Sequence, residues 1–288
     1  MGILYNYLMW LFLSLITAFF WGVAQLLVKK GLTKITPLVN NIIYDIIFFI
    51  IIGCLTFSNG INFKLLFLVI PFTVIIAFCY LSYYYILKKG QLSLTGTVMA
   101  GYPIFTIVLA HLLLAERVSE FQFLAIMIVI FGMIMISLPS ERISIKSLKK
   151  QSWFYWGVVY AILAGLGDFI SKVAINKSDL YTFLFALSLS FLFTSLIYFV
   201  VDKKSRMPLS FSFEQYKYAV SGNLMMVFGM LTFYTAISSG LVSLVTPISS
   251  TYAAITVVLS IKFLHEKITK IQSFAILLLI LGIILIGL

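Results

Sequence analysis

The sequence predicts an all-α integral membrane protein, in which ten transmembrane helices form two inverted five-helix repeats. Three observations lead to this prediction: a very apolar composition, ten apolar segments of membrane-spanning length, and an internal duplication. Of the 288 residues, 62% are hydrophobic and 10% charged, whereas soluble domains have about 45–50% and about 25%. Too few polar side chains remain to cover a soluble fold of this size, so a water-soluble enzyme is excluded.

The apolar residues fall into segments of about 20 residues, the length that a helix needs to cross the hydrocarbon core of a bilayer. Charged residues, Gly, Pro or Asn separate these segments and predict the ends of the helices. The expected spans cover residues 8–28, 38–58, 65–87, 92–114, 120–138, 153–175, 181–201, 216–237, 242–264 and 271–288.

The net charge of +11 comes from 20 Lys and Arg against nine Asp and Glu. These bases are spread over short loops, which argues against nucleic-acid binding. With ten spans, sixteen of them fall on one side of the membrane and four, Lys64, Arg117, Lys172 and Lys177, on or toward the other. The positive-inside rule makes the basic side cytoplasmic. We therefore predict a cell-membrane protein, in a prokaryotic plasma membrane, with both termini outside the cytoplasm.

The second half of the chain repeats the first. Residues 90–138 align without a gap on residues 240–288, with 17 identities in 49 positions. Two five-helix repeats are predicted, at residues 1–138 and 153–288, joined by a basic cytoplasmic linker at 139–152. Because five is an odd number of spans, the two repeats must lie upside down to each other. Inverted repeats are typical of alternating-access transporters, whose substrate site lies between the repeats near the midplane.

Motifs of both halves resemble a known family. Trp21-Gly22 and Lys29 lie near the end of the first span, and Tyr102-Pro103 precedes Glu116-Arg117-Val118-Ser119; Tyr252 and His265-Glu266-Lys267-Ile268-Thr269 repeat the second pattern. The chain resembles the drug/metabolite transporter superfamily, specifically its ten-span EamA-type group. The resemblance implies a helical bundle with a central cavity lined by both halves, and a small-molecule substrate. It also implies cytoplasmic termini, in contrast to the charge distribution.

Ionisable residues inside a span are costly and therefore indicate a functional site. Asp168 and Lys172 are four residues apart in the sixth span, so they can pair on one helical face. Such a pair could be structural, with Lys172 extending toward the interface. It could also bind both charges of a zwitterion, and Asp168 alone could bind a proton or a cation.

A second carboxylate, Asp45, lies about two turns into the second span. It is a candidate for proton coupling, because burial disfavours the charged form of a carboxyl group; the alternative is an interfacial residue at the cytoplasmic mouth. Gln25 and Asn223 are uncharged candidates for substrate binding, although both also suit hydrogen bonding between helices.

The matched Tyr102 and Tyr252 are candidates for substrate binding, because each offers a hydroxyl and a ring face for cations. Pro103 and Pro247 interrupt helical hydrogen bonds and are gating or hinge candidates. The tyrosines at 80 and 83–85 are interpreted as interfacial or packing residues. Glu116 and Glu266 end their spans, where capping or loop pairing is expected.

These features favour a secondary active transporter of a small polar metabolite, an amino acid or an organic cation, driven by a proton or by exchange. The alternative on the same fold is a lipid-headgroup flippase or a subunit of one. A membrane-embedded enzyme is disfavoured, because the chain has no clustered catalytic residues and no HExxH or GxSxG motif. No cofactor is expected, and His111 and His265 form no metal motif. The sequence does not indicate the oligomeric state.

Overall fold

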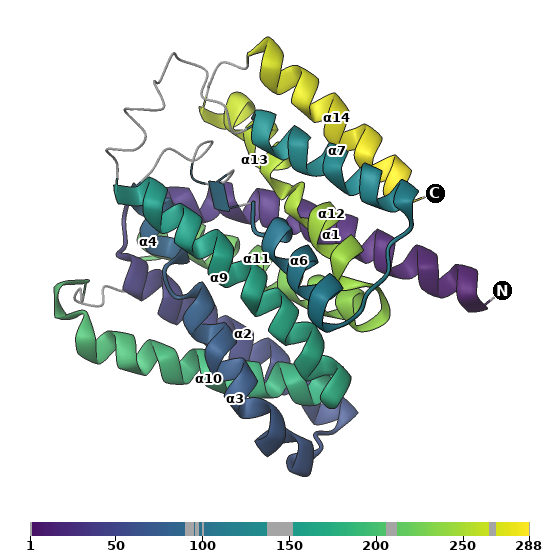
Figure 1. Ribbon diagram of the computed structural model, residues 1–288. Helices are drawn as coiled ribbons and strands as arrows, with labels where there is room; N and C mark the ends of the chain where they lie inside the picture. The colour runs from purple at the N-terminus through teal and green to yellow at the C-terminus, as the bar shows by residue number, and fades with distance from the viewer. Residues whose placement is uncertain are drawn as a thin grey trace.

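The computed structural model describes residues 2–89, 95, 98–99, 101–136, 152–205, 212–264 and 269–287 (Figure 1). These residues form helices and no strands. The α-helices are α1 (Gly2–Gly31), α2 (Pro37–Asn59), α3 (Phe63–Tyr80), α4 (Tyr83–Lys89), α6 (Pro103–Leu113), α7 (Glu120–Ile136), α9 (Ser152–Lys177), α10 (Leu180–Val201), α11 (Phe213–Ser239), α12 (Val242–Ser250), α13 (Tyr252–Leu264) and α14 (Lys270–Ile286).

Most of the described helices fit the predicted spans within a few residues, but α1 begins at Gly2 and the described helix of the predicted fourth span, α6, begins at Pro103. Seven segments are long and apolar enough to cross a membrane, with α3 and α4 counted as one and α12 and α13 as another. Three further apolar helices, α6, α7 and α14, are shorter. The chain is thus an all-helical, multi-pass membrane protein. The first residues of the predicted fourth span and the predicted linker at 139–152, apart from Ser152, lie outside the described residues.

Side-chain caps explain where several helices begin. The Ser119 hydroxyl accepts from the Gln122 N–H at 3.1 Å, and the Gln122 side chain accepts from the Ser119 N–H at 3.1 Å. The same reciprocal box joins Thr269 and Gln272, at the repeat offset of 150 residues. Each box satisfies two backbone donors that the helix itself leaves without partners. The duplication in sequence therefore reproduces a detail of local structure.

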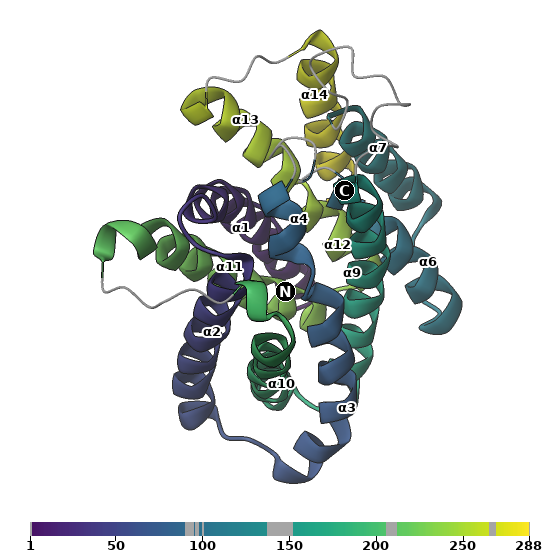
Figure 2. The same ribbon diagram turned by 90° about the vertical axis from the view of Figure 1, so that its left-hand side faces the viewer.

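Helix packing follows the duplication as well. Under the predicted alignment, α9 is the counterpart of α1, and α11 is the counterpart of the segment formed by α3 and α4. The contact of α1 with α11 recurs as the contact of α9 with α3, and the contact of α1 with α12 and α13 recurs as that of α9 with α6. Helix α10 packs against both α2 and α3 and lies between them in Figure 2.

The two last helices of the predicted repeats, α7 and α14, pack along each other through matched glycines. A Cβ on Gly132 would lie 3.3 Å from the Ala275 carbonyl, and one on Gly282 would lie 3.1 Å from the Ala125 carbonyl. The two contacts are equivalent, because Gly282 is the counterpart of Gly132 and Ala125 is the counterpart of Ala275 at the offset of 150 residues. Residue numbers rise in opposite directions along the two helices, so α7 and α14 are antiparallel. This contact supports the inverted relation of the halves, which remains a prediction for the chain as a whole.

Two spans are interrupted at the matched tyrosines: the break includes Tyr102 in one span and directly precedes Tyr252 in the other. Residues 101–102 form a turn, after which α6 begins at Pro103. Helix α12 ends at Ser250, and α13 begins at Tyr252 after one turn residue. Pro247 lies inside α12, four residues before that turn ends the helix. Both prolines are therefore close to breaks, whereas their role as hinges stays a prediction.

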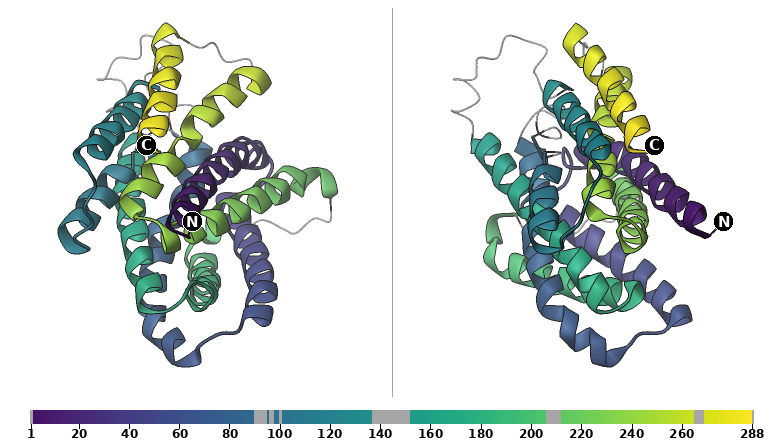
Figure 3. Two further views of the ribbon diagram at one scale, coloured as in Figure 1. Left: turned by 90° about the vertical axis from the view of Figure 1, so that its right-hand side faces the viewer. Right: turned by 45° about the vertical axis from the view of Figure 1, so that its right-hand side comes forward.

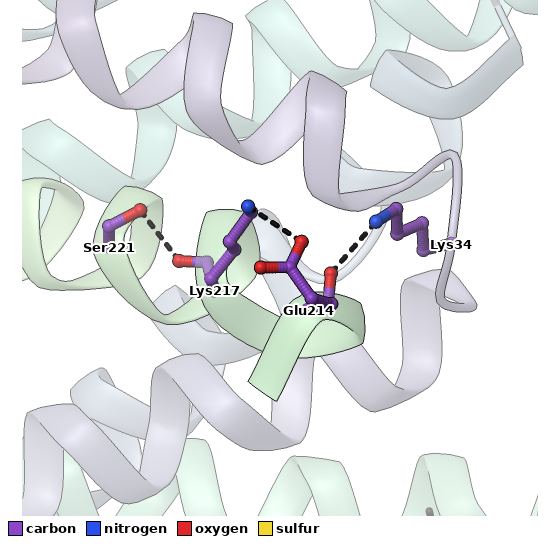
Figure 4. A network of polar contacts seen from close by, with 4 residues as sticks. All are labelled: Lys34, Glu214, Lys217 and Ser221. Atoms are coloured by element: carbon purple, nitrogen blue, oxygen red, sulfur yellow. Dashed lines mark hydrogen bonds and ion pairs between the residues drawn. The ribbon is translucent and has the colours of Figure 1, made fainter. Parts of the chain in front are cut away.

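Three of the basic residues predicted to share a side, Lys29, Lys34 and Lys217, lie at one end of the bundle. Lys34 Nζ donates to the Glu214 carbonyl at 2.8 Å, and Lys217 pairs with the Glu214 carboxylate at 2.7 Å (Figure 4). Lys29 Nζ donates to the Leu87 carbonyl at 2.5 Å, near the end of α4. The two chain termini lie on the same side of the molecule, away from this end (Figures 1 and 3).

Candidate functional site

A buried cavity of about 80 Å³ lies in the centre of the bundle. Its wall comes from spans of both predicted repeats and, among the described residues, includes seven tyrosines, two carboxylates and no lysine or arginine. The lining residues described by the structure are Trp21, Gln25, Asn41, Tyr44, Asp45, Ala77, Tyr80, Leu81, Tyr83, Tyr84, Tyr102, Tyr160, Ala164, Asp168, Phe191, Thr194, Met226, Met230 and Tyr252.

Asp168 stands on α9 with only 2% of its surface exposed. One carboxylate oxygen, Oδ1, accepts a hydrogen bond from the Tyr80 hydroxyl at 2.6 Å. The other, Oδ2, is buried and has no hydrogen-bond partner among the described residues. A buried carboxylate oxygen without a donor is costly. Asp168 therefore has unused capacity to bind a hydrogen-bond donor or a positive charge inside the cavity.

A glycine sets the place of Asp168 in the wall. Gly165, one turn earlier on α9, lies so close to the fourth span that a Cβ there would be 2.6 Å from the Tyr102 carbonyl and 2.7 Å from the Phe105 Cβ. The Thr106 hydroxyl also donates to the Gly165 carbonyl at 3.2 Å. This close approach brings Asp168 and Tyr102 into one cavity.

Asp45 is the second buried carboxylate, with 1% of its surface exposed. Its Oδ2 accepts hydrogen bonds from Asn41 Nδ2, at 3.0 Å, and from the Ser195 hydroxyl. Asn41 Nδ2 also lies 2.7 Å from Ser195 Oγ, which ties α2 to α10. The Asp45 carboxylate thus belongs to a hydrogen-bond network with Asn41 and Ser195, whereas Asp168 Oδ2 has no partner among the described residues. The structure buries Asp45 and places it in the cavity wall, whereas its role in proton coupling stays a prediction.

The tyrosines of the cavity wall are the main feature that sequence reasoning missed. Tyr80, Tyr83 and Tyr84 were interpreted as interfacial or packing residues, but all three line the cavity. The rings of Tyr83 and Tyr160 lie 5.6 Å apart. The hydroxyls of Tyr83 and Tyr44 are buried without hydrogen-bond partners among the described residues. The concentration of tyrosine at residues 80–85 was the available sign, but interfacial tyrosines give the same pattern.

The predicted ion pair between Asp168 and Lys172 does not form. Lys172 Nζ donates to the carbonyls of Ile237, at 2.6 Å, and Gly240, at 2.9 Å. These carbonyls lie at the end of α11, where the helix leaves acceptors unsatisfied and its dipole favours a cation. The spacing of four residues permitted a pair, but the neighbouring helix offers Lys172 better acceptors. Lys172 does not line the cavity.

Of the other residues predicted to bind substrate, three line the cavity and one forms hydrogen bonds between helices. Tyr102, Tyr252 and Gln25 line the cavity. Asn223 does not: its Oδ1 accepts from the Tyr84 hydroxyl at 3.0 Å, and its Nδ2 donates to the Asn40 side chain at 3.2 Å. Because it is buried between three helices and outside the cavity wall, its assignment to substrate binding is corrected to interhelical hydrogen bonding.

We expect the substitution Lys172→Met to leave ligand binding in the cavity within about threefold of wild type, because Lys172 caps α11 instead of facing the cavity. The melting temperature should fall, since two helix-end carbonyls lose a charged donor. Ligand titration and thermal unfolding of the purified variant would check both expectations. A loss of binding of about 100-fold, equal to that of an Asp168 variant, would instead support a substrate site formed by Asp168 and Lys172 together.

The fold and the cavity define the class of the protein: it is a multi-pass helical membrane protein whose central cavity is lined by spans from both predicted repeats. The sequence model of the EamA-like transporter family matches residues 8–138 and 151–288. The chain belongs to the EamA-like transporter family, consistent with the drug/metabolite transporter superfamily. It is therefore a transporter and not an enzyme, and the family implies a small-molecule substrate.

Two further proteins are similar to this chain: one matches about half of it, and the other matches nearly all of it. An uncharacterized protein of Methanocaldococcus jannaschii is 32% identical over 131 residues, which cover 46% of this chain and 93% of the relative. The relative thus corresponds to about half of this chain. A solved crystal structure of a protein at 12% identity has a TM-score of 0.75 and covers 96% of this chain and 95% of its own. At that identity the likeness shows the fold alone.

Proposed function

We propose that the protein is a secondary active transporter of a small organic cation, working by alternating access. One observation carries the proposal: the buried Asp168 Oδ2 has no partner among the described residues, inside a cavity lined by tyrosines and by no basic side chain. A zwitterionic amino acid fits less well, because Lys172, the expected partner of its carboxylate, bonds elsewhere.

The tyrosine-rich wall supports a cation as well. Aromatic faces attract cations through their quadrupole, with an energy of about 2 kcal/mol when both are desolvated. Tyr80, Tyr102, Tyr160 and Tyr252 line the same cavity as Asp168. A carboxylate surrounded by aromatic rings would bind a quaternary or protonated amine and reject anions.

For the coupling of transport we propose Asp45 as the proton site and Asp168 as the substrate site. Asp45 Oδ2 already accepts from Asn41 and Ser195, so this oxygen has less free capacity for a substrate than Asp168 Oδ2. A buried carboxylate that alternates between proton-bound and proton-free states would respond to a proton gradient. Exchange against a second cation at Asp168 is the alternative form of coupling.

A ligand-stabilisation screen tests the proposed function. Purified protein in detergent is heated with tetramethylammonium, choline, alanine or glucose, and the melting temperature is recorded. A ligand at 100 times its dissociation constant stabilises the folded state by about 2.7 kcal/mol. The proposal expects a shift with tetramethylammonium or choline and none with glucose. A shift with alanine alone would overturn it in favour of a zwitterion, and no shift with any probe would favour the lipid-headgroup flippase.

The orientation gives a separate prediction. We expect a cysteine at Leu113, exposed at the end of α6, to react with a membrane-impermeant maleimide in intact cells. A cysteine at the exposed Lys204, among the basic loops, should react only after lysis. Both are placed in a chain with Cys54 and Cys79 replaced by serine. The reverse labelling pattern would place the termini in the cytoplasm, as the family resemblance implies.

A further inference from the structure

Glu116 joins the two predicted repeats by a buried contact outside the cavity. It follows α6 in the first repeat and is 8% exposed. Its carboxylate accepts hydrogen bonds from the backbone N–H groups of Val242, at 3.1 Å, and Ser243, at 3.0 Å, and from the Ser243 hydroxyl. Val242 and Ser243 are the first residues of α12, in the second repeat. The sequence predicts capping or loop pairing at Glu116, and in the structure this residue caps a helix 126 residues away.

The hydrogen bonds between Glu116 and the start of α12 are strong, but they can be exchanged for hydrogen bonds to water. The first N–H groups of a helix have no partners within the helix, and its dipole favours a negative charge there. Hydrogen bonds to a carboxylate are about twice as strong as those between neutral groups. If the repeats separate at this point, water can solvate both the carboxylate and the N–H groups, so nothing is left buried without a partner.

The chain just before Glu116 has a strained backbone conformation at the end of α6. Ala115 has a φ of +52°, in the left-handed region, and is the one non-glycine residue with positive φ in the described part of the chain. The N–H groups of Leu114 and Glu116 both donate to the Ala110 carbonyl, which turns the chain back over the end of α6. Strain of this kind persists where surrounding contacts hold it and is concentrated at functional and switching sites.

The contact also lies at a place where it can act on the cavity. It is at the end of the bundle opposite Lys34 and Lys217, because α11 begins beside them and ends directly before α12. The Tyr102 hydroxyl of the cavity wall donates to the Thr246 carbonyl of α12 at 3.4 Å. Lys172, nearby, bonds α9 to the end of α11 within the second repeat, so it does not join the repeats.

We propose that Glu116 is a latch that holds this end of the bundle closed by binding the start of α12, and that the latch releases when the repeats rock apart. The inference rests on the proposed alternating-access function, because a rigid protein would need no latch. Tyr102 and Glu116 bond to α12 one turn apart, at Thr246 and at Val242 and Ser243, which is the route by which a cation in the cavity would act on the latch.

Spin labels flanking the contact test the latch without any substrate. Cysteines at Leu113 and Ser238, both exposed, are labelled in a chain whose Cys54 and Cys79 are serine, and their distance distribution is measured by double electron–electron resonance. We expect Glu116→Gln to raise the ratio of long to short distances by about tenfold. Glu120→Gln, the same change at an exposed residue of α7, is the matched control and should leave the distribution unchanged.

Two further variants keep the test decisive. Ser243→Ala removes one of the three hydrogen bonds to Glu116 and should open the latch less than Glu116→Gln does. Ala115→Gly relieves the backbone strain without touching the carboxylate, and the short distance should be kept. The latch is refuted if Glu116→Gln, folded by its melting transition, shows the wild-type distribution. If tetramethylammonium fails to bind the wild type while Glu116→Gln still opens, the latch stands and the substrate proposal fails.

Discussion

The substitution Asp168→Asn is expected to weaken cation binding by at least about 100-fold, a loss of about 2.8 kcal/mol. Asparagine has nearly the same shape, and its carbonyl oxygen can still accept the hydrogen bond that Tyr80 gives to Oδ1. What it lacks is the negative charge that Asp168 brings into a cavity whose described wall holds no basic side chain. The affinity for tetramethylammonium or choline, measured by calorimetric titration of purified protein, checks this expectation.

Two further variants test the roles of Tyr80 and Asp45 beside Asp168. Tyr80→Phe keeps the carboxylate and removes the donor to Oδ1, so it should retain most of the cation affinity. Asp45→Asn tests the division of roles: cation binding should persist, whereas uptake driven by a proton gradient in vesicles should be lost. Asp168→Asn with wild-type affinity and an unchanged melting temperature would remove Asp168 from the substrate site.

The substitution Gly165→Ala is expected to lower both stability and cation affinity. The added methyl group would lie 2.6 Å from the Tyr102 carbonyl and 2.7 Å from the Phe105 Cβ, so α9 must move away from the fourth span. Overpacking of this kind costs about 1–3 kcal/mol. Since Asp168 is one turn further along α9, the same displacement should separate it from Tyr102 in the cavity wall.

Gly53→Ala is the matched control, because a Cβ at Gly53 would meet nothing within 4 Å. Alanine favours a helix over glycine by about 1 kcal/mol, so this variant should be as stable as the wild type or slightly more stable. Thermal unfolding and cation titration of both variants give the comparison. Equal melting temperatures for Gly165→Ala and the wild type would mean that α9 does not pack on the fourth span as closely as described.

Much of the fold could be predicted from the sequence because the bilayer limits what an apolar chain can do. Backbone groups in hydrocarbon must bond within a helix, so apolar segments of sufficient length indicate the spans. The offset of 150 residues correctly placed α7 and α14 as counterparts, with the same bounds, caps and glycine contacts. The breaks at Tyr102 and before Tyr252 lie close to Pro103 and Pro247, which the sequence marks as hinge candidates.

The site depended on information that periodicity does not contain. Asp168, Asp45, Gln25, Tyr102 and Tyr252 were proposed from chemistry and do line one cavity. Lys172 and Asn223 were equally plausible from their spacing, yet both bond to neighbouring helices, since a polar group in a span takes whichever buried acceptor or donor its neighbours present. The tyrosines of α3 and α4 could not be told from interfacial tyrosines without knowing how deep they lie.

The sequence by itself determined that the chain is a helical membrane protein, where its helices run and which segments are duplicated, because these follow from hydropathy and local caps. Only the tertiary structure decided which polar groups are satisfied and which are not. Asp168 Oδ2 has no partner among the described residues and Glu116 is fully engaged with α12, although both are single carboxylates in apolar surroundings. That difference arises from contacts between helices distant in sequence, which no local pattern encodes.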